Sequence, residues 1–142
     1  MPHPKAAAAR ARVRLAAAVR AFLGSRGYQE VETPCLVPAP GTEPHLLAFE
    51  TPFALEGGGA PRRLWLHTSP EYAMKRLLAG GFERVFQLAR VFRNGEVSAT
   101  HNPEFTMLEF YRAGTDYRGI MEDLEALTAE AARELLGGTR LS

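Results

Sequence analysis

The sequence predicts an α+β domain in which an antiparallel sheet is flanked by helices. Three observations support this fold class. Strand-like segments are joined by turn signals, and apolar residues recur with helical spacing near both ends of the chain and once between them. The strands do not alternate regularly with helices, and neither a G-x-G-x-x-G motif nor a Walker loop is present. A bound nucleotide would therefore need another kind of loop.

A first helix is predicted over residues 6–26, and Gly27 suits the position just after its C-terminus. Its apolar face is formed by Leu15, Val19, Phe22 and Leu23. Residues 1–29 contain several basic residues and no acidic one. Such a segment is typical of a transit peptide, of a polyanion-binding helix, or of a helix with a solvated basic face, and we favour the last.

The next segment predicts short strands. YQEVETP is a strand that ends at Pro34, because proline cannot donate to a sheet hydrogen bond. The turn-rich stretch Val37–His45 is predicted as an ordered loop. AFETPFAL and RLWLHTS then predict two strands, which GGGAP joins as a hairpin.

A second helix is predicted in TSPEYAMKRLLAGG. Pro70 fits its first position, and Thr68 with Glu71 has the spacing of a capping box. Glu71 then needs no further role. The alternative is that Glu71 belongs to a binding site, since a helix start also presents backbone donors to anions.

The segment FERVFQLARVFR is apolar on both faces, which predicts a central strand, and FTMLEFYR is its predicted antiparallel partner. A last helix follows, capped by Asp116 and closed by Gly137. Its apolar stripe is formed by Ile120, Leu124, Leu127, Ala131 and Leu135.

The connection between these two strands is unusually long and polar. Hairpins usually close with about two to five residues, whereas residues 94–104 separate the two strands here. Arg93 at the start of the loop can hold phosphate or carboxylate oxygens, and His101 and Asn102 can add donors to the same anion. Phe105 offers a flat face for a purine ring. Together these residues favour a nucleotide site.

Glu109 and Tyr111 share one face of the second strand. A carboxylate among apolar neighbours is costly unless it is paired, so the two residues would receive an ammonium group well. The alternative is an internal ion pair between Glu109 and Arg90 on the neighbouring strand.

The composition argues against several classes of protein, including general nucleic-acid binders, secreted proteins and membrane proteins. The formal net charge of +1 does not suggest general nucleic-acid binding. Arginines interrupt every candidate secretory signal, and no stretch is long and apolar enough to span a bilayer. Cys35 is the only cysteine, which favours a reducing cytoplasm. The histidines and this cysteine have no zinc-ligand spacing, so no metal ligands are expected.

The chain resembles the first half of a class II aminoacyl-tRNA synthetase catalytic domain of the lysine type. The long helix and the strand ending at Pro34, about residues 12–34, resemble motif 1, the dimer-forming element of that class. FQLARVFRNGEVSATHNPEFTMLEFY, within residues 84–112, resembles motif 2, the strand–loop–strand that binds ATP. HTSPEYAMKRLLAGG and HNPEFTMLEFYRAG are most similar to the elongation factor P–(R)-β-lysine ligases of this family.

The resemblance implies an ATP-dependent ligase that activates lysine or (R)-β-lysine as an adenylate, with Mg²⁺ neutralising the triphosphate. It implies that Arg93 is the catalytic residue and contacts the α-phosphate. The ATP site would comprise Arg93, Asn94, Gly95, His101, Asn102 and Phe105. The amino-acid site would comprise Ser69, Pro70, Glu71, Glu109 and Tyr111.

The chain departs from the family pattern in three ways, and each departure changes what we expect of the site, the acceptor or the extent of the chain. The family reads R-N-E after the first motif 2 strand, whereas this chain has Gly95 there and Glu96 one place later, so Glu96 is expected to point elsewhere. No anticodon-binding barrel precedes the first helix, which favours elongation factor P over tRNA as the acceptor. No motif 3 precedes Ser142, so a truncated ligase is expected. The alternatives are a lysyl-tRNA synthetase and a non-catalytic fragment that dimerises or binds.

Overall fold

The computed structural model describes residues 4–139 as two compact units. The first unit contains residues 4–30, 82–86 and 111–139, and the second contains 31–81 and 87–110. The strands β5 (Arg84–Phe92) and β6 (Glu104–Arg112) run through both units. Their predicted pairing is confirmed, because β5 lies between β1 (Gln29–Glu30) and β6 in one three-stranded sheet.

That sheet is mixed, which corrects the expectation of a purely antiparallel sheet. β1 pairs with β5 in parallel, with Gln29 opposite Val85 and Glu30 opposite Phe86. β5 and β6 are antiparallel: Arg93 N–H donates to the Pro103 carbonyl at one end, and Ala113 N–H donates to the Glu83 carbonyl at the other. The parallel pairing follows from the chain path, because the segment between β1 and β5 is long enough for a crossover.

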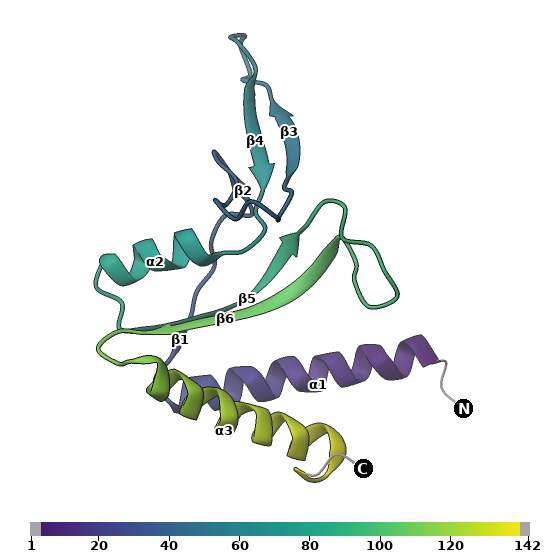
Figure 1. The fold of residues 1–142 in the computed structure, drawn as a ribbon, viewed down its shortest axis with the longest axis vertical. Helices are drawn as coiled ribbons and strands as arrows, with labels where there is room; N and C mark the ends of the chain where they lie inside the picture. The colour runs from purple at the N-terminus through teal and green to yellow at the C-terminus, as the bar shows by residue number, and fades with distance from the viewer. Residues whose placement is uncertain (1–3, 140–142) are drawn as a thin grey trace. The chain divides into compact units, whose positions relative to one another are not determined.

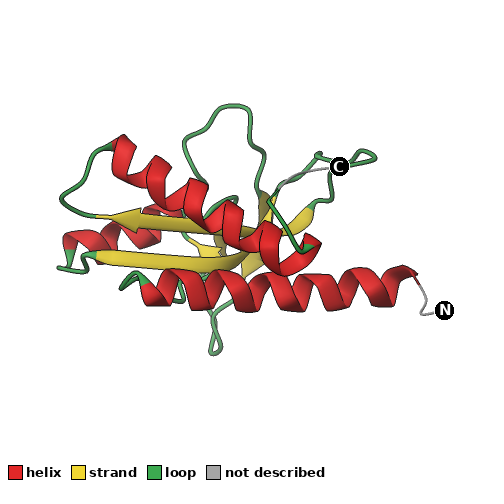
Figure 2. Ribbon diagram, turned by 90° about the horizontal axis from the view of Figure 1, so that it is seen from below, coloured by secondary structure: helices red, strands yellow, loops and turns green. Residues whose placement is uncertain are grey.

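The first unit contains the helices α1 (Pro4–Ser25) and α3 (Tyr117–Leu136), which lie alongside each other (Figures 1 and 2). Leu23 of α1 and Leu127 of α3 are buried. Arg14 of α1 bonds both the side chain and the carbonyl of Glu134. Other arginines of the basic segment also have acidic partners in this unit, which supports the prediction of an ordinary basic helix surface.

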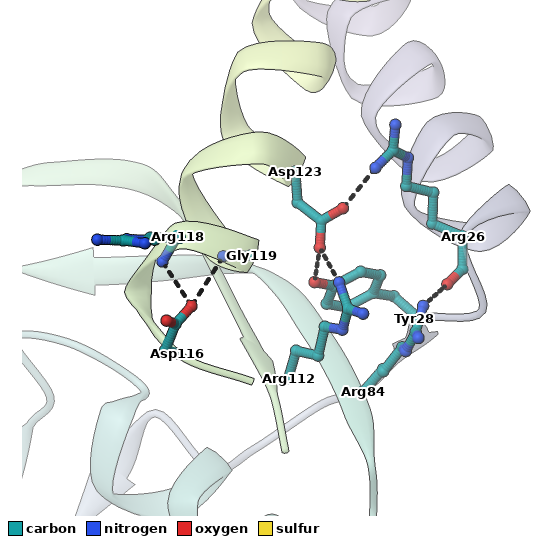
Figure 3. A network of polar contacts seen from close by, with 8 residues as sticks. All are labelled: Arg26, Tyr28, Arg84, Arg112, Asp116, Arg118, Gly119 and Asp123. Carbon is teal, nitrogen blue, oxygen red and sulfur yellow. Dashed lines mark hydrogen bonds and ion pairs between the residues drawn. The ribbon is translucent and has the colours of Figure 1, made fainter. Parts of the chain in front are cut away.

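The predicted caps of α3 are confirmed. The Asp116 carboxylate accepts hydrogen bonds from the N–H groups of Arg118 and Gly119, and Gly137 ends the helix in the left-handed conformation (Figure 3). The predicted apolar stripe is partly wrong, because Leu124 is 49% exposed whereas Asp123 is only 2% exposed.

Asp123 can be buried because three donors reach its carboxylate (Figure 3). Arg26 Nη1 lies 2.6 Å from Oδ1, and the Tyr28 hydroxyl lies 2.6 Å from Oδ2. Arg112 Nη1 lies 3.4 Å from Oδ2. Burial alone would raise the pKa of Asp123, but the hydrogen bonds and the two positive charges lower it below the ordinary value.

The second unit is built on a small sheet of β2 (Leu36–Val37), β4 (Arg62–Leu66) and β3 (Phe49–Phe53), in that order and antiparallel. The predicted hairpin of β3 and β4 is confirmed, whereas β2 includes Val37, the first residue of the predicted loop 37–45. The helix α2 (Glu71–Ala79) follows β4. No helix among residues 4–139 is long and apolar enough to cross a membrane.

Candidate nucleotide and amine site

The polar loop between β5 and β6 is closed at its base and ordered at its tip. Its base is closed by the Arg93–Pro103 backbone bond of 2.9 Å, and its tip by a 3.1 Å bond from Ser98 N–H to the His101 carbonyl. Figure 1 shows this loop extending from the ends of the two strands. The backbone N–H of Asn94 donates to the Leu47 carbonyl at 2.7 Å, which ties the loop to the segment before β3.

Arg93 sits at the start of this loop with an incompletely satisfied guanidinium group. Its Nε is buried and has no hydrogen-bond partner among the described residues. Its guanidinium lies over the ring of Phe105, 5.3 Å from the centroid. Its nearest carboxylate is that of Glu96, at 3.8 Å from Nη1, which is too long for a hydrogen bond. The guanidinium group is therefore held in place and partly shielded from solvent, and it can donate a hydrogen bond to an anionic oxygen.

Gly95 determines where Glu96 lies. The φ angle of Gly95 is +82°, a conformation that favours glycine. The turn at this residue brings the half-buried Glu96 carboxylate beside Arg93. Sequence spacing alone missed this neighbour of Arg93, and the expectation that Glu96 lies away from the position of the family glutamate stays a prediction.

The other residues predicted for the nucleotide are exposed on the loop. Asn94 and Asn102 are exposed, and His101 bonds through Nδ1 to the hydroxyls of Ser98, at 2.8 Å, and Thr100, at 3.2 Å. These bonds orient the imidazole ring, so that Nε2 is the atom left to approach a ligand.

A second cluster surrounds Ser69 at the start of α2. The Ser69 hydroxyl donates to the Glu109 carboxylate at 2.7 Å and accepts a 3.0 Å bond from Glu71 N–H. The predicted capping box of Thr68 and Glu71 is therefore wrong, because Ser69 bonds the first turn and the residue at the N-cap is the buried Pro70. Ser69 is held between the helix start and the Glu109 carboxylate.

Glu71 and Glu109 can both interact with an ammonium group. The Glu71 carboxylate forms an ion pair with Lys75 one turn along α2, and this hydrogen bond, followed by the charge of Glu71, raises the pKa of Lys75. Because Lys75 follows Glu71 by four residues in a predicted helix, the sequence could have identified it as the ion-pair partner of Glu71. The ion pair of Arg90 joins Glu104, at 3.5 Å, rather than Glu109 as the alternative interpretation required.

The structure therefore forms two groups from the predicted site residues of the second unit. Arg93 and Phe105 are in contact in one, and Ser69, Glu71 and Glu109 are joined in the other. Tyr111 is half-buried and belongs to the first unit. Among residues 4–139, no group of three His, Cys, Asp or Glu side chains is placed to hold a metal ion.

Two comparisons with known proteins point to the same family. Residues 4–142 match the family of class II tRNA synthetases (D, K and N). The chain is 47% identical over 128 residues to the lysine–tRNA ligases of Burkholderia thailandensis and Burkholderia ambifaria. Each match covers 90% of this chain and 24% of the relative, so the chain spans about a quarter of the length of the curated relatives it matches.

Proposed function

The chain belongs to the class II tRNA synthetases of the D, K and N group, and from this we propose that it carries ATP-binding and lysine-binding parts of a lysine-activating ligase. The observation that carries the proposal is the buried Arg93 Nε, which has no partner among residues 4–139. A buried donor left unpaired is costly, and a phosphate or carboxylate oxygen would satisfy it.

In this proposal ATP binds along the polar loop. The Arg93 guanidinium meets the α-phosphate, and adenine stacks on the ring of Phe105. His101 approaches the terminal phosphates through Nε2. The remaining contacts come from Asn94, Asn102 and the backbone of Gly95.

The amino acid binds at the second cluster. The Glu109 carboxylate, oriented by Ser69, receives the side-chain ammonium, while Glu71 and Pro70 lie at the other amino group. The carboxylate of lysine or (R)-β-lysine attacks the α-phosphorus of ATP. One oxygen–phosphorus bond forms, and the bond to pyrophosphate breaks. Arg93 stabilises the charge that develops on the phosphoryl oxygens, so catalysis consists of positioning and electrostatics.

The acceptor of the activated amino acid is tRNA in this proposal. The relatives are named lysine–tRNA ligases, which favours tRNA over the lysine of elongation factor P that the sequence resemblance suggested. Transfer to elongation factor P is the alternative outcome of the acceptor experiment below.

We further place the protein in the cytoplasm as a homodimer that uses residues 12–34 as motif 1. Val13 on α1 is 70% exposed, and Leu15 is also exposed, so an apolar surface is available for a second copy. Sedimentation of the chain over a range of concentrations tests this assembly, and a monomer at every concentration would contradict it.

ATP binding tests the nucleotide site directly. Arg93→Ala should weaken ATP binding by about 100-fold, because it removes a charge-assisted pair with the phosphate. Arg62→Ala, which changes an exposed arginine on β4, is the matched control and should bind ATP normally. Equal ATP affinity in the two variants would overturn the proposed role of Arg93.

Pyrophosphate exchange tests the chemistry. The assay uses a protein that contains this chain and has the full length of the relatives. We expect it to catalyse ATP–pyrophosphate exchange in the presence of lysine or β-lysine. Labelled amino acid is then offered to tRNA and to elongation factor P in parallel. Label on tRNA supports the proposed acceptor, whereas label on elongation factor P alone would replace it.

A further inference from the structure

The tip of the polar loop between β5 and β6 holds an imidazole ring between two hydroxyl groups. Ser98 Oγ lies 2.8 Å from His101 Nδ1, and Thr100 Oγ1 lies 3.2 Å from the same nitrogen. The backbone N–H of Thr100 donates to Ser98 Oγ at 3.2 Å. All three residues are exposed. The hydrogen bonds therefore fix the orientation of a ring that would otherwise rotate in solvent.

The turn at the tip does not need these side-chain bonds for its closure. The backbone closes it, because Ser98 N–H donates to the His101 carbonyl and Val97 N–H donates to the Gly95 carbonyl, each at 3.1 Å. The base of the loop is closed separately by Arg93 N–H and the Pro103 carbonyl. The two hydroxyls thus act on the imidazole ring rather than on the path of the chain.

The bond from Ser98 determines which imidazole nitrogen carries the proton. Ser98 Oγ accepts from the Thr100 N–H, which favours donation of its own hydroxyl proton to the neighbouring Nδ1. A neutral imidazole has one acceptor nitrogen and one donor nitrogen, so an accepting Nδ1 places the proton on Nε2. His101 then presents Nε2–H as a donor, which suits an anionic oxygen.

The acidic residues of the loop lie beside arginines and not at its tip. Residues 97–103 include no acidic side chain. The Glu96 carboxylate lies 3.8 Å from Arg93, and the Glu104 carboxylate lies 3.5 Å from Arg90. The tip of the loop therefore offers hydrogen-bond donors to an anion without a carboxylate of its own that would repel it.

We propose that Ser98 is a positioning residue that makes this loop selective for nucleotides with terminal phosphates. It holds His101 with Nε2–H available to a phosphate beyond the α-phosphate, so the site prefers a nucleoside triphosphate to a monophosphate. The inference rests on the proposed function, which puts the α-phosphate at Arg93 and the terminal phosphates at His101. It deepens that function by assigning the residue through which the loop distinguishes the two nucleotides.

Calorimetric titration of the 142-residue chain with ATP and with AMP, in one magnesium buffer, tests the selectivity. Ser98→Ala should weaken ATP binding about fivefold and leave AMP binding unchanged, because AMP has no terminal phosphate. Ser98→Thr keeps a hydroxyl and should restore the parent ratio of the two affinities. Ser25→Ala, which removes an exposed hydroxyl of α1, is the matched control and should behave as the parent.

A double-mutant cycle tests whether Ser98 acts through His101. His101→Ala should weaken ATP binding and leave AMP binding unchanged. Adding Ser98→Ala to His101→Ala should cause no further loss, since the ring that Ser98 positions is already absent. A full additional loss of ATP affinity in the double variant would show that Ser98 acts independently of His101 and would overturn the proposed role.

The imidazole nitrogens provide a readout that needs no nucleotide. In alkaline buffer, long-range ¹H–¹⁵N correlation should show Nε2 of His101 as the protonated nitrogen and Nδ1 as the unprotonated one. A proton on Nδ1 in the parent chain would overturn the assignment. Equal weakening of ATP and AMP by Ser98→Ala would also overturn it, because Ser98 would then support only the shape of the loop.

The parent chain separates failure of this inference from failure of the proposed function. Tighter binding of ATP than of AMP supports both. Equal binding of the two nucleotides would overturn the selectivity of the tip and leave the nucleotide site in place. Absence of binding by either nucleotide would overturn the proposed nucleotide site, and the role of Ser98 with it.

Discussion

The two units differ in whether a buried charged group has hydrogen-bond partners. In the first unit, the buried Asp123 carboxylate accepts from Arg26, Tyr28 and Arg112 (Figure 3). In the second unit, Arg93 has a buried Nε without a partner, and its nearest carboxylate is 3.8 Å away. A satisfied network holds elements of the fold together, whereas an unsatisfied one is available for a ligand. Substitutions should therefore affect stability in the first unit and binding in the second.

The largest effect is expected at Asp123. Asp123→Asn removes a buried charge while two arginines remain, so it should lower the free energy of unfolding by about 3 kcal/mol. Urea denaturation measures this change. Glu122→Gln, an exposed change on the same helix, is the control and should stay within about 0.5 kcal/mol of the parent.

The pH dependence of stability provides a second check on Asp123. Its pKa is lower in the folded state, so its contribution is complete above the unfolded value of about 3.9 and is lost as the pH falls toward the folded value. The Asn variant should lack this acid-dependent loss. If the two proteins lost stability equally on acidification, the network would not hold the carboxylate ionised.

The second effect concerns the amine cluster. Glu109→Gln should weaken binding of the amino-acid substrate about thirtyfold, since a charge-assisted bond is worth about 2 kcal/mol, while stability changes little. Calorimetric titration with lysine and a thermal melt measure the two quantities. Glu104→Gln on the same strand is the control. A large loss of thermal stability with unchanged affinity would make Glu109 a structural residue like Asp123.

The third effect separates geometry from charge at Arg93. Arg93→Lys keeps the positive charge but removes the planar fork, so ATP should bind about tenfold more weakly. Stability should not fall, because the lost Nε makes no hydrogen bond among the described residues. Fluorescent-ATP titration and urea denaturation test both statements. A clear drop in stability would mean that the contact with Phe105 supports the fold.

The fourth effect is smaller and lies in the first unit again. Burial, followed by the bond to Asp123, raises the pKa of Tyr28 in the folded state. Its contribution is therefore complete below the unfolded value of about 10 and is lost as the pH rises beyond it. Tyr28→Phe should cost about 1 kcal/mol at neutral pH and abolish this alkaline loss. Denaturation at pH 7 and above pH 10 measures both.

Local signals in the sequence predicted much of the fold. Asp116 and Gly137 identified the ends of α3, and the apolar pattern of β5 identified a central strand. Contacts between distant residues were not visible in the sequence. Tyr28 and Asp123 meet although 95 residues separate them, and an aspartate within an apolar stripe gives no local signal of burial. Tertiary partners decide such positions.

The candidate site shows the same division. The sequence placed Arg93 and Phe105 at the two ends of the polar loop, and the contact between them is visible only in the structure. The capping box was wrong because Ser69, not Thr68, bonds the start of α2. Thr68 instead lines a cavity beside Gly41, a placement that depends on how the loop before β3 folds back.

The smallest expected effect tests whether Glu96 restrains Arg93. Glu96 lies 3.8 Å from the guanidinium, so it attracts Arg93 without bonding it, and it would repel an incoming phosphate. Glu96→Gln should therefore strengthen ATP binding about threefold, because the partly exposed charge is screened by solvent. The gain should shrink at high salt, which the same fluorescent-ATP titration detects. Weaker ATP binding in Glu96→Gln would show instead that Glu96 holds Arg93 in place, as Asp123 does for its own arginines.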